Sequence, residues 1–215
     1  MNSVLFDFDN EIIQPNLALI GTDEAGRGPG AGDVVAAAVY FPSIDKKLQK
    51  ELITLNDSKK LTEKQREHLY EVIIKNSIYD IVFGSVDEIE KTNILKTSLN
   101  CMQKACLNVI SKIQERDILV IIDGNKLIPN FIYQQKYIIK GDSKSASIAA
   151  ASILAKVSRD RYMKELSKEF PEYKWAENKG YMTEEHLQAV DKYGLTKYHR
   201  KKFFEKHFAK QLSLF

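Results

Sequence analysis

The sequence is poor in the residues that cross-link or stiffen small extracellular proteins. Its 215 residues include two cysteines, five prolines and one tryptophan. Cys101 and Cys106 lie five positions apart in a predicted helix, so they point to different faces, and neither a mutual disulfide nor a cysteine metal site is expected. We expect both to be thiols of the protein core, and the fold to depend on packing rather than on cross-links.

Long apolar runs and a secretory signal are also lacking. The longest apolar run, around IAAASILAKV, is too short and too broken to span a bilayer. The first residues, MNSVLFDFDNE, carry acid where a secretory signal carries basic charge, and no small-residue cleavage site follows. We expect a cytoplasmic monomer without a membrane span, whose length suits one packed domain with an appendage.

Charge of one sign is not in large excess, since the net charge is +3. Its distribution is uneven, however, because residues 192–210 hold seven Lys or Arg against one Glu, with aromatic residues between them. Such a segment is typical of a surface that meets nucleic-acid phosphates, and equally of a solvated helix face. The composition leaves both interpretations open.

Alternating β-rich and helical patterns predict an α/β fold. Apolar runs predict strands at residues 17–22, 34–41, 78–86, 117–125 and 133–140. Helices are predicted with a capping box between Thr62 and Gln65, over residues 92–114, and after residue 141. From residue 170 onward Pro171 and a loop interrupt the pattern, so a smaller helical part is expected there.

Acidic residues end two of these strands and begin one helix. Asp23 and Glu24 follow the first strand, Asp123 ends the fourth, and Asp142 stands at the helix start. If the strands are neighbours, the four carboxylates converge, because open α/β sheets build their sites at strand ends. Successive strand residues face opposite sides, so Asp23 and Glu24 share a site only if the strand stops there, as the following glycines predict.

Converging carboxylates indicate a metal site. They raise one another's pKa unless a cation compensates them, and Mg²⁺ and Mn²⁺ prefer oxygen ligands. Two ions about 3.5–4 Å apart would activate a water and stabilise the leaving oxygen at a phosphodiester, so phosphoryl chemistry fits best. For any single acid the alternative is a solvated carboxylate or a helix cap, which suits Asp142 well.

Five segments together resemble the bacterial ribonuclease HII family: GTDEAGRGPGAG, DSKKLT, IIDGN, KGDSKSASIAAASILAKVSRDR and NKGYMTEEH. The resemblance implies a ribonuclease H-like mixed five-stranded sheet flanked by helices over residues 1–169, and a helical substrate-binding segment over 170–210. It implies cleavage of the RNA strand of RNA–DNA hybrids, and incision 5′ of single ribonucleotides in duplex DNA, with 3′-hydroxyl and 5′-phosphate ends. Ribonucleotide removal and RNA primer processing would be the tasks.

The resemblance also implies roles for particular residues. The four acids would bind two Mg²⁺ or Mn²⁺ ions as the catalytic centre. A side-chain-poor loop lets backbone groups approach a 2′-hydroxyl, and Tyr181 would stack on the next deoxyribose. The implied substrate contacts are Gly26, Arg27, Gly28, Lys59, Lys60, Ser143, Tyr181, His199 and Arg200.

Two positions depart from the family pattern. The family usually has a bulky apolar residue where Gly30 stands and a proline where Asp33 stands. Neither is an expected ligand, but Asp33 adds negative charge near the site and could alter metal affinity or loop stiffness.

The chain ends in QLSLF, residues 211–215, which resembles the short peptide that bacterial proteins use to bind the DNA polymerase sliding clamp. Gln211 would make polar contacts, and Leu212, Leu214 and Phe215 would fill apolar pockets. The alternative is that these apolar residues fold back on the core.

Two other functions stay open. VLFDFDNE has the apolar-strand-then-DxD pattern of a haloacid-dehalogenase-type phosphatase with Asp7 as nucleophile, although Glu11 stands where Thr or Val is expected. A hybrid-binding module without turnover would use the basic segment and Tyr181. Converging carboxylates argue against that module, because they add nothing to the binding of a polyanion.

Overall fold

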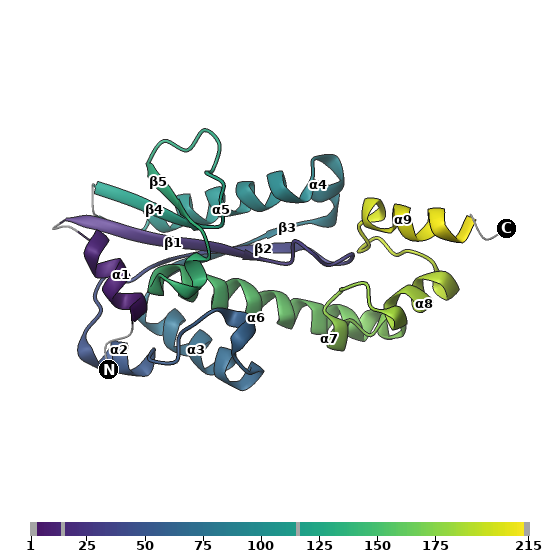
Figure 1. The fold of residues 1–215 in the computed structure, drawn as a ribbon, viewed down its shortest axis with the longest axis horizontal. Coiled ribbons are helices and arrows are strands. Elements are labelled where there is room, and N and C mark those ends of the chain that lie inside the picture. The colour runs from purple at the N-terminus through teal and green to yellow at the C-terminus, as the bar shows by residue number, and fades with distance from the viewer. Residues whose placement is uncertain (1–3, 14–15, 115–116, 213–215) are drawn as a thin grey trace.

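A mixed five-stranded sheet forms the centre of the fold (Figure 1). The computed structural model describes residues 4–13, 16–114 and 117–212. The strands are β1 (Leu17–Ala25), β2 (Val34–Tyr40), β3 (Ile78–Gly84), β4 (Asp117–Asp123) and β5 (Gln134–Ile138). Their order is β3-β2-β1-β4-β5, with β1–β2 and β2–β3 antiparallel and β1–β4 and β4–β5 parallel. The carboxyl ends of β1 and β4 therefore meet at one edge.

Small residues in β2 allow helices to pack closely on both faces of the sheet. Its sequence VVAAAVY is buried throughout. Ala36 and Ala38 share a core with α5 (Ile94–Ile110), whereas Ala37 shares a core with α6 (Ala146–Glu169) on the other face. This is the burial pattern of a strand covered on both sides.

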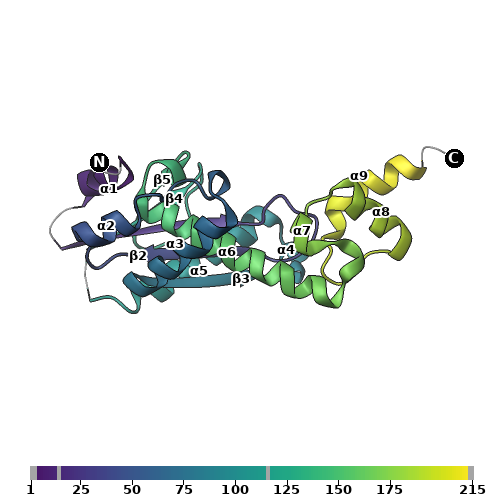
Figure 2. The ribbon, with the colours of Figure 1, turned by 90° about the horizontal axis from the view of Figure 1, so that it is seen from below.

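The other helices flank this centre or extend it. They are α1 (Val4–Ile12), α2 (Lys46–Glu51), α3 (Glu63–Asn76), α4 (Val86–Lys91), α7 (Trp175–Asn178), α8 (Glu184–Tyr193) and α9 (Lys201–Leu212), with 3₁₀ turns η1 (Ser58–Lys60), η2 (Gly141–Ser143) and η3 (Pro171–Tyr173). Both views show α8 and α9 beyond the sheet, at the far end of α6 (Figures 1 and 2). Within the described residues, no helix combines the length and apolarity needed to cross a membrane.

Most sequence-based elements are confirmed, with shifted ends. All five predicted strands occur, the Thr62–Gln65 capping box is present, and both cysteines are buried and free. The helix predicted over 92–114 occurs as α5, which begins where the Asn93 side chain accepts a hydrogen bond from Lys96 N and ends at Ile110. The short helix α2 was not expected.

The N-terminal helix contradicts the phosphatase alternative. Residues of VLFDFDNE form α1 rather than a strand, and Asp7 is exposed on it. Asp9 is buried instead, and its Oδ2 accepts hydrogen bonds from Ser147 N and Ser147 Oγ, both at 2.8 Å. A carboxylate of α1 thus satisfies the first turn of α6, where the helix dipole favours negative charge.

A separate aromatic core in the C-terminal part encloses two histidines. Thr196 N donates to His199 Nδ1 at 2.9 Å, so the ring proton of His199 lies on Nε2, 3.1 Å from His186 Nε2. His186 Nε2 also accepts from Trp175 Nε1, at 3.2 Å, which leaves His186 Nδ1–H to donate to Tyr181 O at 2.9 Å. Each ring is satisfied in its neutral form.

We expect this histidine pair to make stability depend on pH. Burial, and then the neighbouring His186, lower the pKa of His199 from 6.5 to about 3. Between these values the unfolded chain binds a proton that the folded chain does not. The free energy of unfolding therefore falls by about 1.4 kcal/mol per pH unit as the pH drops through this window, and the contribution is fully present above 6.5.

Urea unfolding between about pH 7.5 and about pH 4.5 measures this slope. His199→Gln should remove the contribution of one proton to the change of unfolding free energy with pH, about 1.4 kcal/mol per pH unit in this window, whatever it does to stability at neutral pH. A variant with the slope of the wild type would show that His199 is not held neutral.

Candidate active site

One cavity of about 580 Å³ gathers most of the residues singled out in the sequence. It is lined by all four acids, by Gly26, Arg27, Gly28, Lys59 and Tyr181, and also by Ala25, Ser58, Ile94, Ser152, Lys156, Arg159 and Phe203. The prediction that the acids converge is therefore confirmed, although they come from β1, β4 and η2.

Strand register brings the acids together. β1 and β4 pair in parallel as far as Thr22 opposite Ile122, so Asp23 and Asp123 come next at adjacent strand ends. Asp142 arrives through η2, and Gly141 N donates to Asp123 Oδ1 at 2.7 Å. Asp142 does not cap α6, because the Ser145 side chain accepts from Ile148 N there. Two strand ends and one anchored turn thus place the carboxylates.

The expectation that β1 stops at its acids is wrong. β1 continues to Ala25 along β2, with Glu24 opposite Ala36. Its pairing with β4 stops at Thr22 and Ile122, and β4 itself ends at Asp123, so Glu24 lies beyond the end of β4. The side chains of Asp23 and Glu24 both line the cavity. Consecutive residues of β1 thus line one cavity where its pairing with β4 has stopped, one residue before β1 itself ends at Ala25.

Burial and mutual repulsion raise the pKa values of these acids. Asp23 is 5% exposed, and its pKa lies well above the usual range because of burial, then the charges of Glu24 and Asp123. Burial also raises the pKa of Glu24, although the Arg27 guanidinium, 3.0 Å away, opposes this. Burial and then Asp123 raise the pKa of Asp142. Burial and the neighbouring carboxylates thus disfavour the charged forms of Asp23, Glu24 and Asp142.

This donor set fits a hard divalent cation, because oxygen-rich carboxylate clusters lose their repulsion when such an ion binds. Within the part of the chain that the structure describes, no three His, Cys, Asp or Glu side chains already close around a single point as a metal shell would. The four carboxylates that line the cavity are the residues that would hold such a cation.

The glycine loop, residues 26–33, forms a second wall. Gly26 has φ +98°, and a β-carbon there would lie 2.1 Å from Arg159 Nε, so no larger residue fits. A β-carbon on Gly28 would lie 3.4 Å from Tyr181 Cε1. Tyr181, half exposed, belongs to the tyrosine loop, residues 178–183, and its ring stands beside Gly28. The two loops meet at the cavity.

Several predicted substrate contacts lie elsewhere. Lys60 is exposed at the end of η1 and Ser143 Oγ donates to Lys140 O, and neither lines the cavity. Gln211 and Leu212 end α9, and Leu214 and Phe215 lie outside the described residues. The sliding-clamp interpretation therefore stays a prediction.

The duplex-facing role expected for His199 and Arg200 is wrong in this structure. They are 1% and 0% exposed. Arg200 Nε and Nη2 donate to Gly32 O at 2.9 and 2.6 Å, and Nη1 donates to Pro29 O at 2.7 Å. The guanidinium supports the glycine loop from behind, because these carbonyls replace the water that it gives up.

The structure shows what surrounds Gly30 and Asp33, the two positions that depart from the family pattern. Met182 and Phe204 occupy the space beside Gly30, each with an atom within 3 Å of where a β-carbon would stand. Asp33 does not line the cavity. Its Oδ1 accepts from Val86 N at 3.3 Å. Burial raises the pKa of Asp33, and the Val86 hydrogen bond and the Arg200 and Arg159 charges oppose this rise.

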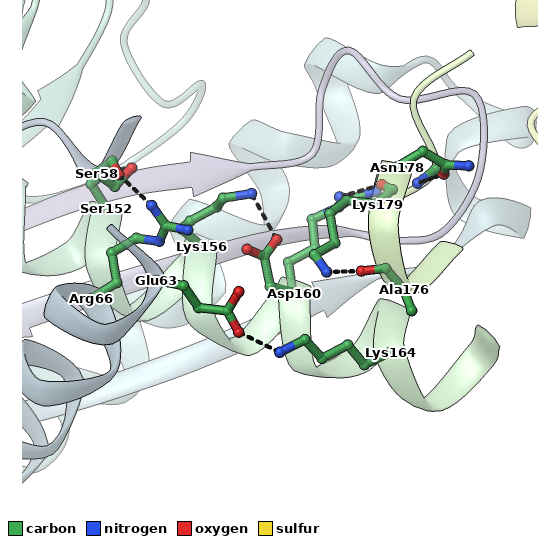
Figure 3. Close-up of polar contacts among 12 residues, drawn as sticks. Ser58, Glu63, Arg66, Ser152, Lys156, Asp160, Lys164, Ala176, Asn178 and Lys179 are labelled. Carbon is green, nitrogen blue, oxygen red and sulfur yellow. Dashed lines mark hydrogen bonds and ion pairs between the residues drawn. The ribbon is translucent and has the colours of Figure 1, made fainter. Parts of the chain in front are cut away.

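The part of the cavity that α6 lines was not predicted from the sequence. Ser152, Lys156 and Arg159 follow one another at helical spacing and line it together. Ser152 Oγ donates to Ser58 Oγ at 3.0 Å, and Lys156 Nζ lies 2.7 Å from Asp160 Oδ1 (Figure 3). The polar spacing i, i+4, i+7 inside an alanine-rich helix was the available signal.

Comparison with known proteins agrees with this geometry. A family model described as Ribonuclease HII matches residues 20–211. The chain is 53% identical over 186 residues to the Ribonuclease HII of Pelagibacter ubique, covering 86% of this chain and 95% of the relative. It is 49% identical over 189 residues to that of Fusobacterium nucleatum, covering 87% and 86%.

A solved structure shares the fold. The ribonuclease H2 of Pyrococcus horikoshii superposes with a TM-score of 0.68 at 25% identity, over 90% of this chain and 99% of that one. The chain belongs to the ribonuclease HII family and is a metal-dependent ribonuclease H, an endonuclease that hydrolyses phosphodiester bonds.

Proposed function

We propose that this enzyme cleaves the RNA strand of RNA–DNA hybrids and incises duplex DNA on the 5′ side of single ribonucleotides, leaving 3′-hydroxyl and 5′-phosphate ends. The observation that carries the proposal is the single cavity that joins four carboxylates, the glycine loop and Tyr181. Such a cavity can hold the scissile phosphate, a 2′-hydroxyl and the next sugar at once. Ribonucleotide removal and RNA primer processing are the tasks this suits.

The four acids would hold two divalent cations, Mg²⁺ or Mn²⁺. Such a pair, when bound, activates a water and stabilises the leaving oxygen of an in-line displacement. The chain's own contribution is to orient the ligands: Gly141 N fixes Asp123, and Arg27 holds Glu24. Because Asp23 is almost fully buried, water has little access around it, which strengthens its interaction with a cation.

The glycine loop would recognise the ribonucleotide. A 2′-hydroxyl distinguishes RNA from DNA, and a backbone without bulky side chains can approach it closely. Arg27 is half exposed, so its planar donors can reach a flanking phosphate while one of them holds Glu24. Tyr181 would stack on the deoxyribose that follows, since its ring is half exposed beside Gly28.

Basic side chains beside the acids would bind the phosphate backbone. Lys59 and Lys156 line the cavity. Lys156, Lys164 and Lys179 lie near Asp160 (Figure 3). Burial lowers the pKa of Lys179; the charge of Asp160 opposes this, and the charges of Lys164 and Lys156 add to it. A polyanion would relieve this crowding of positive charge.

Cleavage of a duplex that contains one ribonucleotide tests the proposed substrate. A duplex DNA with one ribonucleotide should be cut at its 5′ side with Mg²⁺ or Mn²⁺ and left intact with EDTA, whereas an all-DNA duplex should stay intact throughout. A gel that separates the labelled strand measures this, beside a continuous RNA–DNA hybrid. Cleavage of the continuous hybrid alone would keep the metal site and remove the role proposed for Tyr181.

Substitution of single carboxylates tests their role as cation ligands. Asp23→Asn and Asp123→Asn should each lower turnover by at least about a hundredfold, because each removes a cation ligand, while duplex binding changes little. Single-turnover cleavage and fluorescence anisotropy in EDTA measure the two quantities. Asp117→Asn, at the exposed opposite end of β4, is the matched control and should behave as wild type. Wild-type turnover in either ligand variant would refute the assignment.

We also propose that residues 211–215 bind the DNA polymerase sliding clamp. Deleting them should abolish clamp pull-down and leave cleavage of short duplexes unchanged, because the segment begins with the last two residues of α9 and no catalytic role is assigned to it. Normal clamp binding by the truncated enzyme would refute the proposal, as would loss of cleavage through unfolding.

A further inference from the structure

Arg159 joins the two loops that meet at the cavity. Its side chain is 2% exposed, and each of its three nitrogen atoms donates to a backbone carbonyl. Nε donates to Asp33 O at 3.0 Å and Nη2 to Ala31 O at 3.0 Å, both in the glycine loop. Nη1 donates to Lys179 O at 2.9 Å, in the tyrosine loop. One rigid plane therefore spans both loops.

The guanidinium itself has little room to move. It projects from α6, a helix of 24 residues that packs against the sheet. Gly26 lies directly against it, since any β-carbon there would overlap Arg159 Nε. Burial lowers the pKa of Arg159, and the negative charges of Asp160 and Asp33 oppose this by favouring the charged form. A buried, fully bonded arginine of this kind fixes geometry, because each of its donors has a set direction.

A second link joins the same loops. Gly180 O accepts from Gly30 N at 2.9 Å and from Ala31 N at 3.2 Å. Gly180 has φ +80°, and a β-carbon there would lie 2.5 Å from Ala31 O. The backbones can thus approach this closely only with glycine at this position. Tyr181 follows immediately, so its place relative to Gly28 depends on both links.

We propose that Arg159 is a positioning residue that fixes the tyrosine loop against the glycine loop, and thereby sets the preference for a ribonucleotide followed by a deoxyribonucleotide. The proposal rests on the function proposed above, in which one loop reads the 2′-hydroxyl and Tyr181 reads the next sugar. Selecting that junction requires both contacts at a fixed separation. If the loops moved independently, each contact would form on its own and a continuous hybrid would be accepted as readily.

Arg159→Lys tests this directly. Lysine keeps the positive charge, but its single ammonium group cannot hold three carbonyls in one plane. We expect kcat/KM on the single-ribonucleotide duplex to fall by about tenfold more than kcat/KM on a continuous RNA–DNA hybrid, because small displacements of positioning groups are costly. Gly180→Ala should shift the ratio in the same direction without changing Arg159.

The control is Arg161→Lys, two residues along α6, where the arginine pairs with Glu67 on the surface. It should keep the wild-type ratio. Equal losses on both substrates in Arg159→Lys and Gly180→Ala would mean that the links only support the fold, and would overturn the proposal. Absence of single-ribonucleotide cleavage by the wild type would instead refute the proposed function.

Amide hydrogen exchange on the wild-type enzyme provides a test that needs no variant. If the links are rigid, the amides of Gly30 and Ala31 exchange nearly as slowly as those of β4. Fast exchange at these two amides, beside slow exchange in β4, would overturn the proposal even if both variants failed to fold.

Discussion

Like charges held together in a mostly buried cavity are the constraint on which the rest of this structure depends. Separate side chains would move apart, so the backbone has to hold them. The parallel register of β1 and β4 sets Asp23 beside Asp123, and Gly141 N fixes Asp123 while bringing Asp142 on the same turn. The cost of this repulsion is met by the cores on both faces of the sheet. The same repulsion makes a divalent cation bind favourably.

The two buried arginines beside the site are stabilised in a different way from the acids. Arg159 and Arg200 are buried, and burial lowers the pKa of Arg200 to about 9. Their donors are satisfied mainly by backbone carbonyls of the glycine loop, so the loop takes its shape from what the guanidinium groups require. Asp33, where the family usually has proline, lies close enough for its charge to favour both arginines. Its charge thus acts on the support of the loop rather than in the cavity.

The sequence allowed the strands and the four acids to be predicted because both depend on local pattern. Apolar runs end at the acids, and Thr62 and Gln65 form a capping box between neighbours in the chain. The predictions that were wrong concern features that depend on tertiary contacts. β1 runs on past its acids because β2 still pairs with it, and His199 and Arg200 face inward because an aromatic core and a loop of carbonyls surround them. No periodicity distinguishes a buried arginine from an exposed one.

α6 connects the cavity, the two loops and the C-terminal core, which neither the motifs nor the fold class predicts. Asp142 precedes its start, Ser152 and Lys156 line the cavity from its middle, and Arg159 supports both loops. Farther along, Met163 belongs to the aromatic core of the C-terminal part. From Ser145 to Arg159 the helix rises roughly 21 Å at about 1.5 Å per residue. Because one helix belongs to both cores, the α6 wall of the cavity and the arginine that supports both loops are mounted on the same rigid element. Their separation therefore cannot relax without unpacking α6 from the sheet.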